Sequence, residues 1–493
     1  MSIERETKLD VGPGFRLPGL DDVLDGVVAT TSDPERARTV YWDTPDLRLA
    51  RWGCSLRHRD GQGWTLKLPR VGEGEALVRE EIVRQGPTAR VPEELAALVT
   101  AYVRGESLQP AVTIRTVRTR VALADAARRR LGEVVDDDVS VLAGRRIAAR
   151  FREVEVETDD RDLAAAAIAR LLAAGAGETI RTPKYLRALG PQGADPPELV
   201  AAGSMPDDAS VHDVVRNAMA ASVIRLVRAD AGIRVGEDPE AVHQARVAAR
   251  RLRSDLHTFG SLLDPSWARP LRQELSWLGG SLGAVRDLDV LAARLESEVA
   301  TLPEPDRAAG GRLIGRLGAA RSVARERLLA DLGSARYVVL FETLVAAAAE
   351  PEVVPEAAGL PARGVMGSVM AGPLEHLAHA CEAIDRASPD EVIHAARIRA
   401  KRARYAAEAL APVFGKAARS FIRAAGKLQD RLGEHQDAVV ASAWLRETAR
   451  RYPSTAFVAG LLAAREEAAR RRARRTWRPA WTAMRGKQPR SWR

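Results

Sequence analysis

The chain contains 493 residues, of which 46% are hydrophobic, with 75 Lys and Arg against 66 Asp and Glu. This length exceeds that of one typical domain, and two cysteines, Cys54 and Cys381, are too few for a disulfide framework. No apolar run approaches the roughly 20 residues of a membrane-spanning helix. The composition therefore excludes a disulfide-rich scaffold and a transmembrane protein, and the charged N-terminal residues in place of a leader predict a cytoplasmic protein.

Charge is distributed unevenly along the chain. Residues 1–200 contain 30 Lys and Arg and 32 Asp and Glu, which leaves 45 basic and 34 acidic side chains for residues 201–493. The basic excess thus belongs to the second part and predicts a polyanionic partner there. Composition alone leaves nucleic acid, polyphosphate and lipid headgroups open as that partner.

The first part of the chain has the pattern of β-strands. Short alternating segments separated by Gly, Pro and Asp recur at residues 3–9, 39–43, 54–60, 63–69, 77–84, 112–123, 132–136 and 150–158. In each, one face is apolar and the other carries charges of both signs. The pattern predicts an eight-stranded antiparallel β-barrel, charged inside and covered outside by helices at 93–104 and 160–174. An ordinary sheet with its polar face in water is the alternative.

Two of these strands carry rows of charged side chains on one face. Glu4, Glu6 and Lys8 alternate near the start, and three carboxylates, Glu153, Glu155 and Glu157, alternate in the last strand. Crowded carboxylates repel unless a cation neutralises them, and carboxylate oxygens are preferred ligands of Mg²⁺ and Mn²⁺. Each strand alone fits a solvated face equally well, and the metal-site hypothesis depends on several strands agreeing.

Beyond a Pro- and Gly-rich linker at 191–206, helical periodicity replaces strand signals. The expected helices lie near 208–231, 238–262, 267–298, 307–331, 335–349, 364–386, 389–411, 416–451 and 455–476. A segment around His243 aligns without gaps on one around His394, at an offset of 151 residues. This repeat predicts two similar all-α bundles, at about 207–349 and 364–476, in an α+β multidomain chain.

Each repeat carries a basic stripe at helical spacing. The two stripes are His243, Arg246, Arg250 and Arg253, and His394, Arg397, Lys401 and Arg404. Each borders an apolar stripe, so the rows are expected to lie beside the bundle cores and to line a groove. Arginine forks bind phosphate oxygens in pairs, and a row of them suits a polymer of phosphates. The alternative is a solvated basic face paired with acidic neighbours; Asp287, Asp289 and Asp437 are expected to orient arginines.

The last residues, 477–493, form a basic segment that includes Trp477, Trp481 and Trp492. Interleaved basic and aromatic residues can bind single-stranded nucleic acid. The favoured prediction is a disordered basic tail with weak affinity for polyanions.

Together these motifs resemble two known families in tandem. Residues 1–190 resemble a CYTH domain, or triphosphate tunnel metalloenzyme, and residues 207–485 resemble a CHAD domain, the conserved-histidine α-helical domain. The first resemblance rests on Glu4, Glu6, Lys8, residues 41–45 (YWDTP), Arg57, Arg59, Lys67, Arg79, Glu81, Glu153, Glu155, Glu157 and Lys184. The second rests on the paired helices at His243 and His394.

The CYTH resemblance implies a tunnel that holds a triphosphate and a divalent cation, Mg²⁺ or Mn²⁺. The implied phosphate ligands are Lys8, Arg57, Arg59, Lys67, Arg79, Arg115, Arg118 and Lys184, although odd spacing places Arg115 and Arg118 on opposite faces of a regular strand. The implied metal ligands are Glu4, Glu6, Glu153, Glu155 and Asp137, with Asp136 and Asp138 as alternatives to Asp137. Catalysis would fall to Glu4, Glu6 and Lys8.

The resemblance implies hydrolysis of inorganic triphosphate in the tunnel and non-catalytic binding of inorganic polyphosphate by both basic stripes, with an association with polyphosphate granules. The alternatives are a polyphosphate-binding protein without catalysis, and a tunnel that hydrolyses thiamine triphosphate or cyclises ATP. A nucleic-acid partner is less expected, because few aromatic residues accompany the basic rows.

Overall fold

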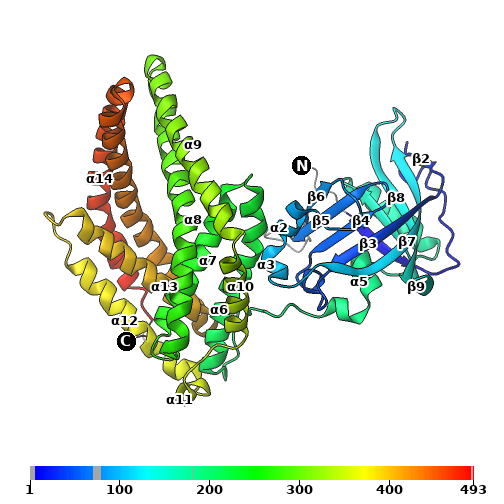
Figure 1. The fold of residues 1–493 in the computed structure, drawn as a ribbon, viewed down its shortest axis with the longest axis horizontal. Coiled ribbons are helices and arrows are strands. Elements are labelled where there is room, and N and C mark those ends of the chain that lie inside the picture. The colour runs from blue at the N-terminus through cyan, green and yellow to red at the C-terminus, as the bar shows by residue number, and fades with distance from the viewer. Residues whose placement is uncertain (1–5, 70–78, 181, 490–491, 493) are drawn as a thin grey trace. The chain divides into compact units, whose positions relative to one another are not determined.

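A computed structural model describes residues 6–69, 79–180, 182–489 and 492. The chain forms two compact units, one up to Pro197 and one from Glu198 onward. The first unit is built on a β-sheet and the second on helices (Figure 1).

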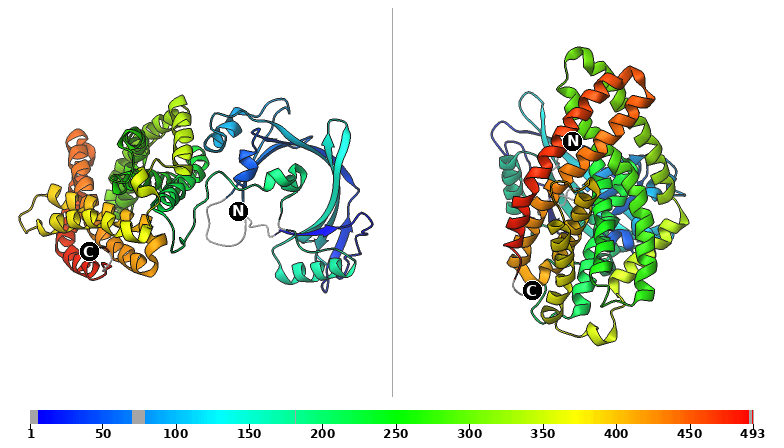
Figure 2. Two further views of the ribbon diagram at one scale, coloured as in Figure 1. Left: turned by 90° about the horizontal axis from the view of Figure 1, so that it is seen from below. Right: turned by 90° about the vertical axis from the view of Figure 1, so that its left-hand side faces the viewer.

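The first unit contains one antiparallel sheet of nine strands within the described residues. The strands are β1 (Glu6–Val11), β2 (Val28–Thr31), β3 (Glu35–Asp43), β4 (Ser55–Arg59), β5 (Gly63–Pro69), β6 (Arg79–Arg84), β7 (Gln109–Ala124), β8 (Arg130–Ala143) and β9 (Arg146–Thr158). They pair in the order β1-β9-β8-β7-β3-β4-β5-β6, and β2 pairs with β7. The prediction of an eight-stranded closed barrel was therefore wrong. β2 adds a ninth strand, and β1 and β6 remain the two ends of a strongly curved, open sheet in the described part (Figure 2, left).

Alternation along the strands separates the two faces of this sheet. On the convex face Leu9, Val154 and Val156 are buried beneath α4 (Arg161–Ala173), whose Leu163 and Leu171 complete the core. Asp160 caps α4 by accepting hydrogen bonds from the first-turn amides. The other helical elements of this unit are α1 (Arg48–Arg51), α2 (Glu93–Leu98), α3 (Thr100–Val103), α5 (Lys184–Leu189) and η1 (Pro191–Ala194).

The short helix α5 lies against the concave face. Tyr185 and Leu186 pack with Ile114 of β7 and Val139 of β8, and the Tyr185 ring stacks on Tyr41 with centroids 5.9 Å apart. This small apolar core fills one part of the concave face and fixes the direction of the Lys184 side chain at the start of α5. The remaining concave surface carries the charged side chains.

The second unit consists of helices. They are α6 (Val211–Val235), α7 (Pro239–Thr258), α8 (Pro265–Ala300), α9 (Glu304–Leu332), α10 (Ala335–Ala349), α11 (Pro355–Ala358), α12 (Ala362–Glu382), α13 (Asp390–Arg451), η2 (Pro453–Thr455) and α14 (Ala456–Arg485). Gly415 has φ 57° and ψ −125°, a conformation that favours glycine, and it divides α13 into two helices. The expected interruption between residues 411 and 416 is confirmed.

The predicted disordered tail was wrong. α14 continues to Arg485, and the side chains of Trp477 and Trp481 are buried along it. Trp492 is 1% exposed and packs edge-on against Phe414 and Phe421, with ring centroids 5.7 and 5.4 Å away. Burial of these rings stabilises the segment, so the indoles are not available for stacking on nucleic-acid bases.

No single helix among the described residues meets the length and apolar composition of a membrane span; only α9 and α10 taken together, across a 64° bend, meet that criterion.

Candidate functional site

Three buried carboxylates form the centre of the concave face. Asp137 of β8 lies opposite Glu153 of β9, and Glu155 follows on the same face of β9. Asp137 and Glu153 are 0% exposed and Glu155 is 3% exposed. One oxygen from each lies within 4.8 Å of the others, and Glu155 forms a second such group with Glu6 and Glu157. Burial of this many carboxylates requires nearby positive charge.

Lysines and an arginine supply that charge. Lys8 Nζ lies 2.6 Å from Glu155 Oε1 and 2.8 Å from Glu6 Oε1. Arg118 binds Asp137 through two parallel contacts, of 2.8 Å from Nε and 2.5 Å from Nη2. Lys184 contacts Asp137 and also lies 3.3 Å from Glu153 and 3.4 Å from Glu155. The sheet register and α5 thus bring side chains from five elements, β1, β7, β8, β9 and α5, to one centre.

These contacts set the ionisation of the carboxyl groups. Burial alone would raise the pKa of Glu155, but Lys184 and Lys8 outweigh it and hold that pKa far below its usual range. The pKa of Asp137 is also lowered, because Arg118 and Lys184 outweigh burial. For Glu153 burial outweighs the neighbouring lysines and raises the pKa. Asp137 and Glu155 are therefore firmly ionised, whereas the neighbouring cations do not fully offset the cost of burying the charge of Glu153.

A divalent cation fits this donor set. Glu153 Oε1 is buried and accepts no hydrogen bond from the described residues. Lys184 Nζ lies 3.3 Å from this oxygen, so the two groups form an ion pair without the geometry of a hydrogen bond. Hard divalent cations bind carboxylate oxygens. The residues that would hold the ion are Asp137, Glu153 and Glu155, or alternatively Glu6, Glu155 and Glu157.

Two arginines beside this centre form no ion pair with any acidic side chain that the structure describes. Arg57 and Arg59 extend from β4 onto the concave face, opposite Tyr41 and Thr39 of β3. Arg59 is 7% exposed, and burial, together with Arg57 and Arg118, lowers its pKa. Its described side-chain hydrogen bonds go to Thr39 at 3.3 Å and to Gln62 at 3.4 Å. Arg57 Nε is buried without an acceptor in the described part of the chain, so both cations are available to an anion.

Other predicted residues fall outside this group. Glu4 lies outside the described residues, as does the side chain of Arg79. Lys67 pairs with Glu81 at 3.0 Å near β6. Arg115 lies opposite Ser140 on the face away from Arg118 and is exposed. The structure does not bring Arg115 to the carboxylate centre.

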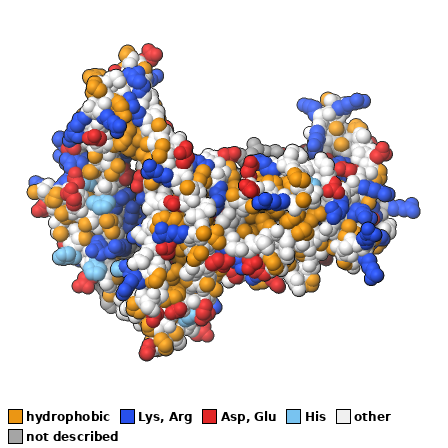
Figure 3. All heavy atoms as spheres, in the orientation of Figure 1, with side chains coloured by type: hydrophobic (Ala, Val, Ile, Leu, Met, Phe, Trp, Pro, Cys, Tyr) orange, Lys and Arg blue, Asp and Glu red, His pale blue; other side chains and the backbone are white. Residues whose placement is uncertain are grey.

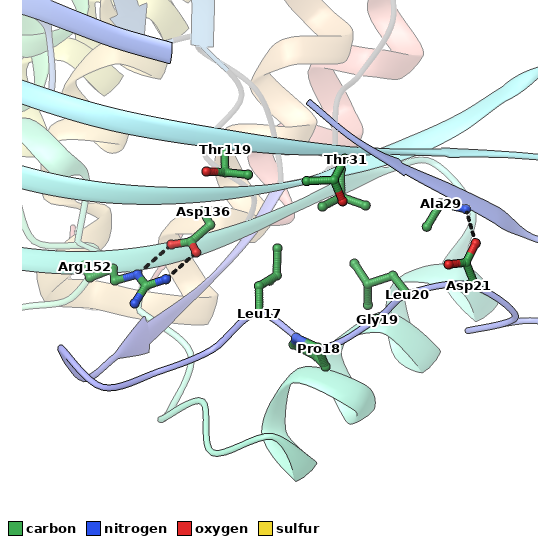
Figure 4. Close-up of a pocket in the computed structure, with 11 residues that line it drawn as sticks. Leu17, Pro18, Gly19, Leu20, Asp21, Ala29, Thr31, Thr119, Asp136 and Arg152 are labelled. Carbon is green, nitrogen blue, oxygen red and sulfur yellow. Dashed lines mark hydrogen bonds and ion pairs between the residues drawn. The ribbon is translucent and has the colours of Figure 1, made fainter. Parts of the chain in front are cut away.

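The strand register separates Asp136 from Asp137, its neighbour in the run of three aspartates. Asp137 faces the concave side, whereas Asp136 faces a convex-side cavity of about 260 Å³ (Figure 4). There Asp136 pairs with Arg152 through contacts of 2.8 and 2.6 Å, and Arg152 donates to the Phe15 carbonyl. Asp136 is therefore a structural partner of Arg152.

Sequence reasoning missed Arg187. This residue lies one turn after Lys184 in α5, binds Glu153 at 3.0 Å and Asp10 at 2.8 Å, and stacks on the Phe151 ring. Its spacing of three residues from Lys184 was the available signal, because i and i+3 share a helix face. Arg187 anchors α5 to the acidic centre.

In the helical unit the two basic stripes meet. Arg246 and Arg250 of α7 approach Arg397 and Lys401 of α13 closely enough that, together with burial, their charges lower the pKa values of Arg397 and Lys401. We call these four residues the central cluster. Figure 3 shows Lys and Arg side chains, with His among them, gathered on this unit. The helical spacing that predicted each row also places the two rows face to face.

Equivalent supports hold the two halves of the central cluster. Arg246 Nη1 lies 2.5 Å from Asp287, and Arg397 Nη2 lies 3.6 Å from Asp437. A Cβ added to Gly283 or Gly433 would come within 3.6 Å of the corresponding guanidinium, so each arginine packs along a glycine of the next helix. The expected orienting role of Asp287 and Asp437 is consistent with these contacts. Asp289 instead pairs with Arg321 of α9.

The central cluster has more cations than partners. Burial, together with Arg397, Arg250 and Arg246, lowers the pKa of Lys401 to about 7. Within the described residues, Arg250 Nε, Arg397 Nε and His394 Nδ1 are buried without a hydrogen-bond acceptor. Burial also lowers the pKa of His243, and Arg286 lowers it further. Buried, unpaired donors of one sign are the electrostatic requirement for binding an anion.

The remaining stripe residues lie at the edge of this cluster. Arg253 is exposed beside Gly279, and Arg404 binds Glu408 at 2.8 Å. Arg404 is therefore partly neutralised, whereas Arg253 has no ion pair among the described residues.

A curved antiparallel sheet that gathers carboxylates and cations on its concave face, followed by a helical repeat with paired basic rows, is the architecture of a CYTH domain joined to a CHAD domain. The chain belongs to this family: the CYTH domain matches residues 2–181 and the CHAD domain matches residues 217–446. CYTH proteins include triphosphatases and adenylate cyclases, and CYTH domains are metal-dependent.

Three known proteins are similar to this chain over most or about half of its length. The chain is 33% identical over 480 residues to the uncharacterized protein Rv2226 of Mycobacterium tuberculosis (strain ATCC 25618 / H37Rv), covering 89% of this chain and 87% of the relative. A solved CHAD domain from the plant Ricinus communis is 27% identical, covers 58% of this chain and 96% of its own, and has a TM-score of 0.48. PptA from Streptomyces chartreusis is 26% identical, covers 56% of this chain and 100% of its own, and has a TM-score of 0.46.

Proposed function

We propose that the concave face of the CYTH domain hydrolyses inorganic triphosphate with the help of Mg²⁺ or Mn²⁺, and that the CHAD domain binds inorganic polyphosphate without catalysis. The observation that carries the first part is the juxtaposition of the carboxylate centre with Arg57 and Arg59, which form no ion pair with a carboxylate of the described residues. Simple capture of a polyanion needs the arginines alone, so the buried carboxylates support catalysis.

The residues of the concave face would have different roles in phosphoryl transfer. Arg57 and Arg59 would hold the phosphate chain through paired donors. Glu6 has a 37% exposed side chain beside Lys8, and it would orient the water whose oxygen attacks the terminal phosphorus as the bond to pyrophosphate breaks. A divalent ion bound by Asp137, Glu153 and Glu155 would neutralise charge on the phosphate oxygens.

Phosphate release from inorganic triphosphate in the presence of Mg²⁺ or Mn²⁺ tests this assignment. The wild-type protein should release phosphate, and Glu6→Gln should abolish release because it removes the group that orients the attacking water. Glu6 is partly exposed, so the variant should fold normally and still bind polyphosphate. Equal release by both proteins would contradict the proposed role of Glu6, and release by neither would contradict triphosphate hydrolysis.

The second part of the proposal rests on the central cluster, where four cations face one another and two donors, Arg250 Nε and Arg397 Nε, are buried without an acceptor among the described residues. A phosphate polymer offers repeating oxygens to such donors. Replacing Arg246, Arg250, Arg397 and Lys401 by Ala should weaken polyphosphate binding strongly and leave triphosphate turnover unchanged. Unchanged binding would show that the cluster is not the polymer site.

A further inference from the structure

A second group of cations lies next to the central cluster. It consists of Arg253 and His257 of α7, Arg272 of α8, His376 of α12, and Arg399 and Arg402 of α13, and we call it the His257 patch. In the described part of the chain none of these side chains forms an ion pair with a carboxylate. All are exposed except Arg399, which is half-buried. Lone surface cations usually carry little energy, but a group without counter-charges creates a local positive field.

The patch arises because the internal repeat is not symmetric in charge. In the gapless alignment Arg251 corresponds to Arg402, and His257 corresponds to Glu408. Arg251 Nη2 lies 2.6 Å from Glu408 Oε2, so the equivalent contact joins Arg402 to His257. Arg251 of α7 is thus neutralised by the Glu408 carboxylate of α13, whereas its counterpart Arg402 of α13 has His257 of α7 at the corresponding position.

Further substitutions enlarge the difference. Ala248 corresponds to Arg399, which adds a cation on the His257 side. Asp255 corresponds to Ala406 in the alignment. Asp255 is buried and lies close enough to Arg251 and Glu408 for their charges to affect its pKa, so Arg251 has a second carboxyl group nearby in addition to Glu408. Burial lowers the pKa of His257, and Arg402, Arg272, Arg399 and His376 lower it further. These influences agree with the helical spacing in placing the cations around one histidine.

The His257 patch continues the basic stripe of α7. Positions 243, 246, 250, 253 and 257 repeat every three or four residues and share one helix face. They extend over about 21 Å at 1.5 Å per residue. The stripe therefore runs without interruption from the central cluster to the patch.

We propose that the polyphosphate path is one-sided: the polymer leaves the central cluster along α7 and continues over the His257 patch, and it does not continue past Arg251 and Glu408. This inference rests on the proposed polyphosphate binding and adds the direction in which the polymer extends from the central cluster. A phosphate polymer is favoured over nucleic acid because Phe259, which follows α7, and Tyr405 of α13, which lies beneath Arg250, are both buried and offer no stacking surface.

Two variants of the full-length protein test the path. R272A/R399A/R402A removes three cations of the patch, and H257E installs the carboxylate that the other repeat carries. R228A/R327A/R446A is the matched control, because it removes three exposed arginines that form no ion pair among the described residues and lie outside both clusters. Binding of a short oligophosphate and of long-chain polyphosphate is measured at several salt concentrations.

Both patch variants should bind long-chain polyphosphate about tenfold more weakly, and the triple variant should lower the salt slope by up to about 3, roughly one per lost phosphate contact. Affinity for the short oligophosphate, which the central cluster alone can hold, should change less than about twofold, and the control should match the wild type. H257Q should also bind like the wild type, because it adds no charge.

Other outcomes would overturn the inference. If R246A/R250A/R397A/K401A abolishes long-chain binding while the patch variants leave it unchanged, the polymer does not cross the patch. If the patch variants lose binding to single-stranded DNA but keep polyphosphate binding, the patch is a nucleic-acid site. Failure of the wild-type protein to bind either polyphosphate would contradict the proposed function itself.

Discussion

At the scale of single residues, the charges that lack partners are the most informative. Arg59 is a buried cation whose described contacts are two neutral side chains. A buried charge without a counter-charge destabilises the free protein, and such residues persist where a ligand supplies the missing charge. The same reasoning applies to Lys401 in the helical unit.

For Arg59→Met we predict opposite effects on stability and on catalysis. The free protein should become more stable by about 1 kcal/mol, because methionine retains part of the packing and removes an uncompensated charge. KM for triphosphate should rise at least about tenfold through loss of a paired phosphate contact. Urea unfolding and steady-state kinetics measure the two effects. A loss of stability with unchanged KM would indicate that Arg59 is structural.

Lys401 predicts a pH dependence of polyphosphate binding. Its pKa in the folded protein is about 7, below the ordinary value of 10.5, so it loses its charge as pH rises above 7. A bound polyanion favours the charged form, and affinity should therefore fall, by up to about tenfold, between pH 7 and pH 9. Lys401→Arg should bind equally well at both values. An equal fall in that variant would assign the dependence to another group.

The same pKa shift affects folding. Because the unfolded state binds more protons than the folded state between pH 7 and pH 10.5, Lys401 makes the free energy of unfolding rise with pH across that window. The pH dependences of binding and of stability therefore have opposite signs.

Residue-level prediction from the sequence succeeded where a single strand or helix period decides a position. Glu155 and Lys8 were found because alternation fixes a strand face, whereas Asp137 came from the family resemblance with Asp136 and Asp138 as alternatives; the structure brings Glu155, Lys8 and Asp137 together. Arg115 was misplaced because the family resemblance allowed both Arg115 and Arg118, whose side chains point to opposite faces of the strand. Arg187 and the His257 patch were missed because their partners come from other elements, which no local pattern specifies.

At the scale of elements, long periodic segments were predictable and local exceptions were not. The expected helix at 335–349 coincides with α10. The strands β4, β5 and β6 lie within their expected ranges, whereas β1, β3, β7, β8 and β9 overlap theirs and extend beyond them. β2 escaped prediction because it is only four residues long and lacks a buried face. The C-terminal segment was misjudged because its arginine content masks a helix that buries Trp477 and Trp481, and because Trp492 packs beyond the end of that helix.

The packed C-terminus gives a stability prediction. Trp492→Ala should destabilise the helical unit by about 3 kcal/mol, because a buried ring between Phe414 and Phe421 leaves a cavity. Phe457→Ala is the control, since that ring is 74% exposed and its loss should be nearly neutral. Thermal unfolding measures both. Equal melting temperatures for the two variants would refute the packing of Trp492.

At the scale of the whole molecule, the chain separates into two units with different cores, for which we propose different ligands. Calorimetry of the intact protein should show two unfolding transitions. Mn²⁺ should raise the temperature of the CYTH transition alone, because only a ligand-binding folded state is stabilised, and Trp492→Ala should lower the other. A single transition that responds to both changes would show that the two units unfold together.

The most direct test of the central claim is a competition between substrates, followed by ³¹P NMR. The wild-type protein is mixed with Mn²⁺ and equal concentrations of inorganic triphosphate, thiamine triphosphate and ATP, with Glu6→Gln as the control. The account predicts that triphosphate is converted first, to equal amounts of pyrophosphate and phosphate, and that the variant converts none of the three. Triphosphate that remains intact while ATP yields cyclic AMP and pyrophosphate, or while thiamine triphosphate is cleaved, would contradict it.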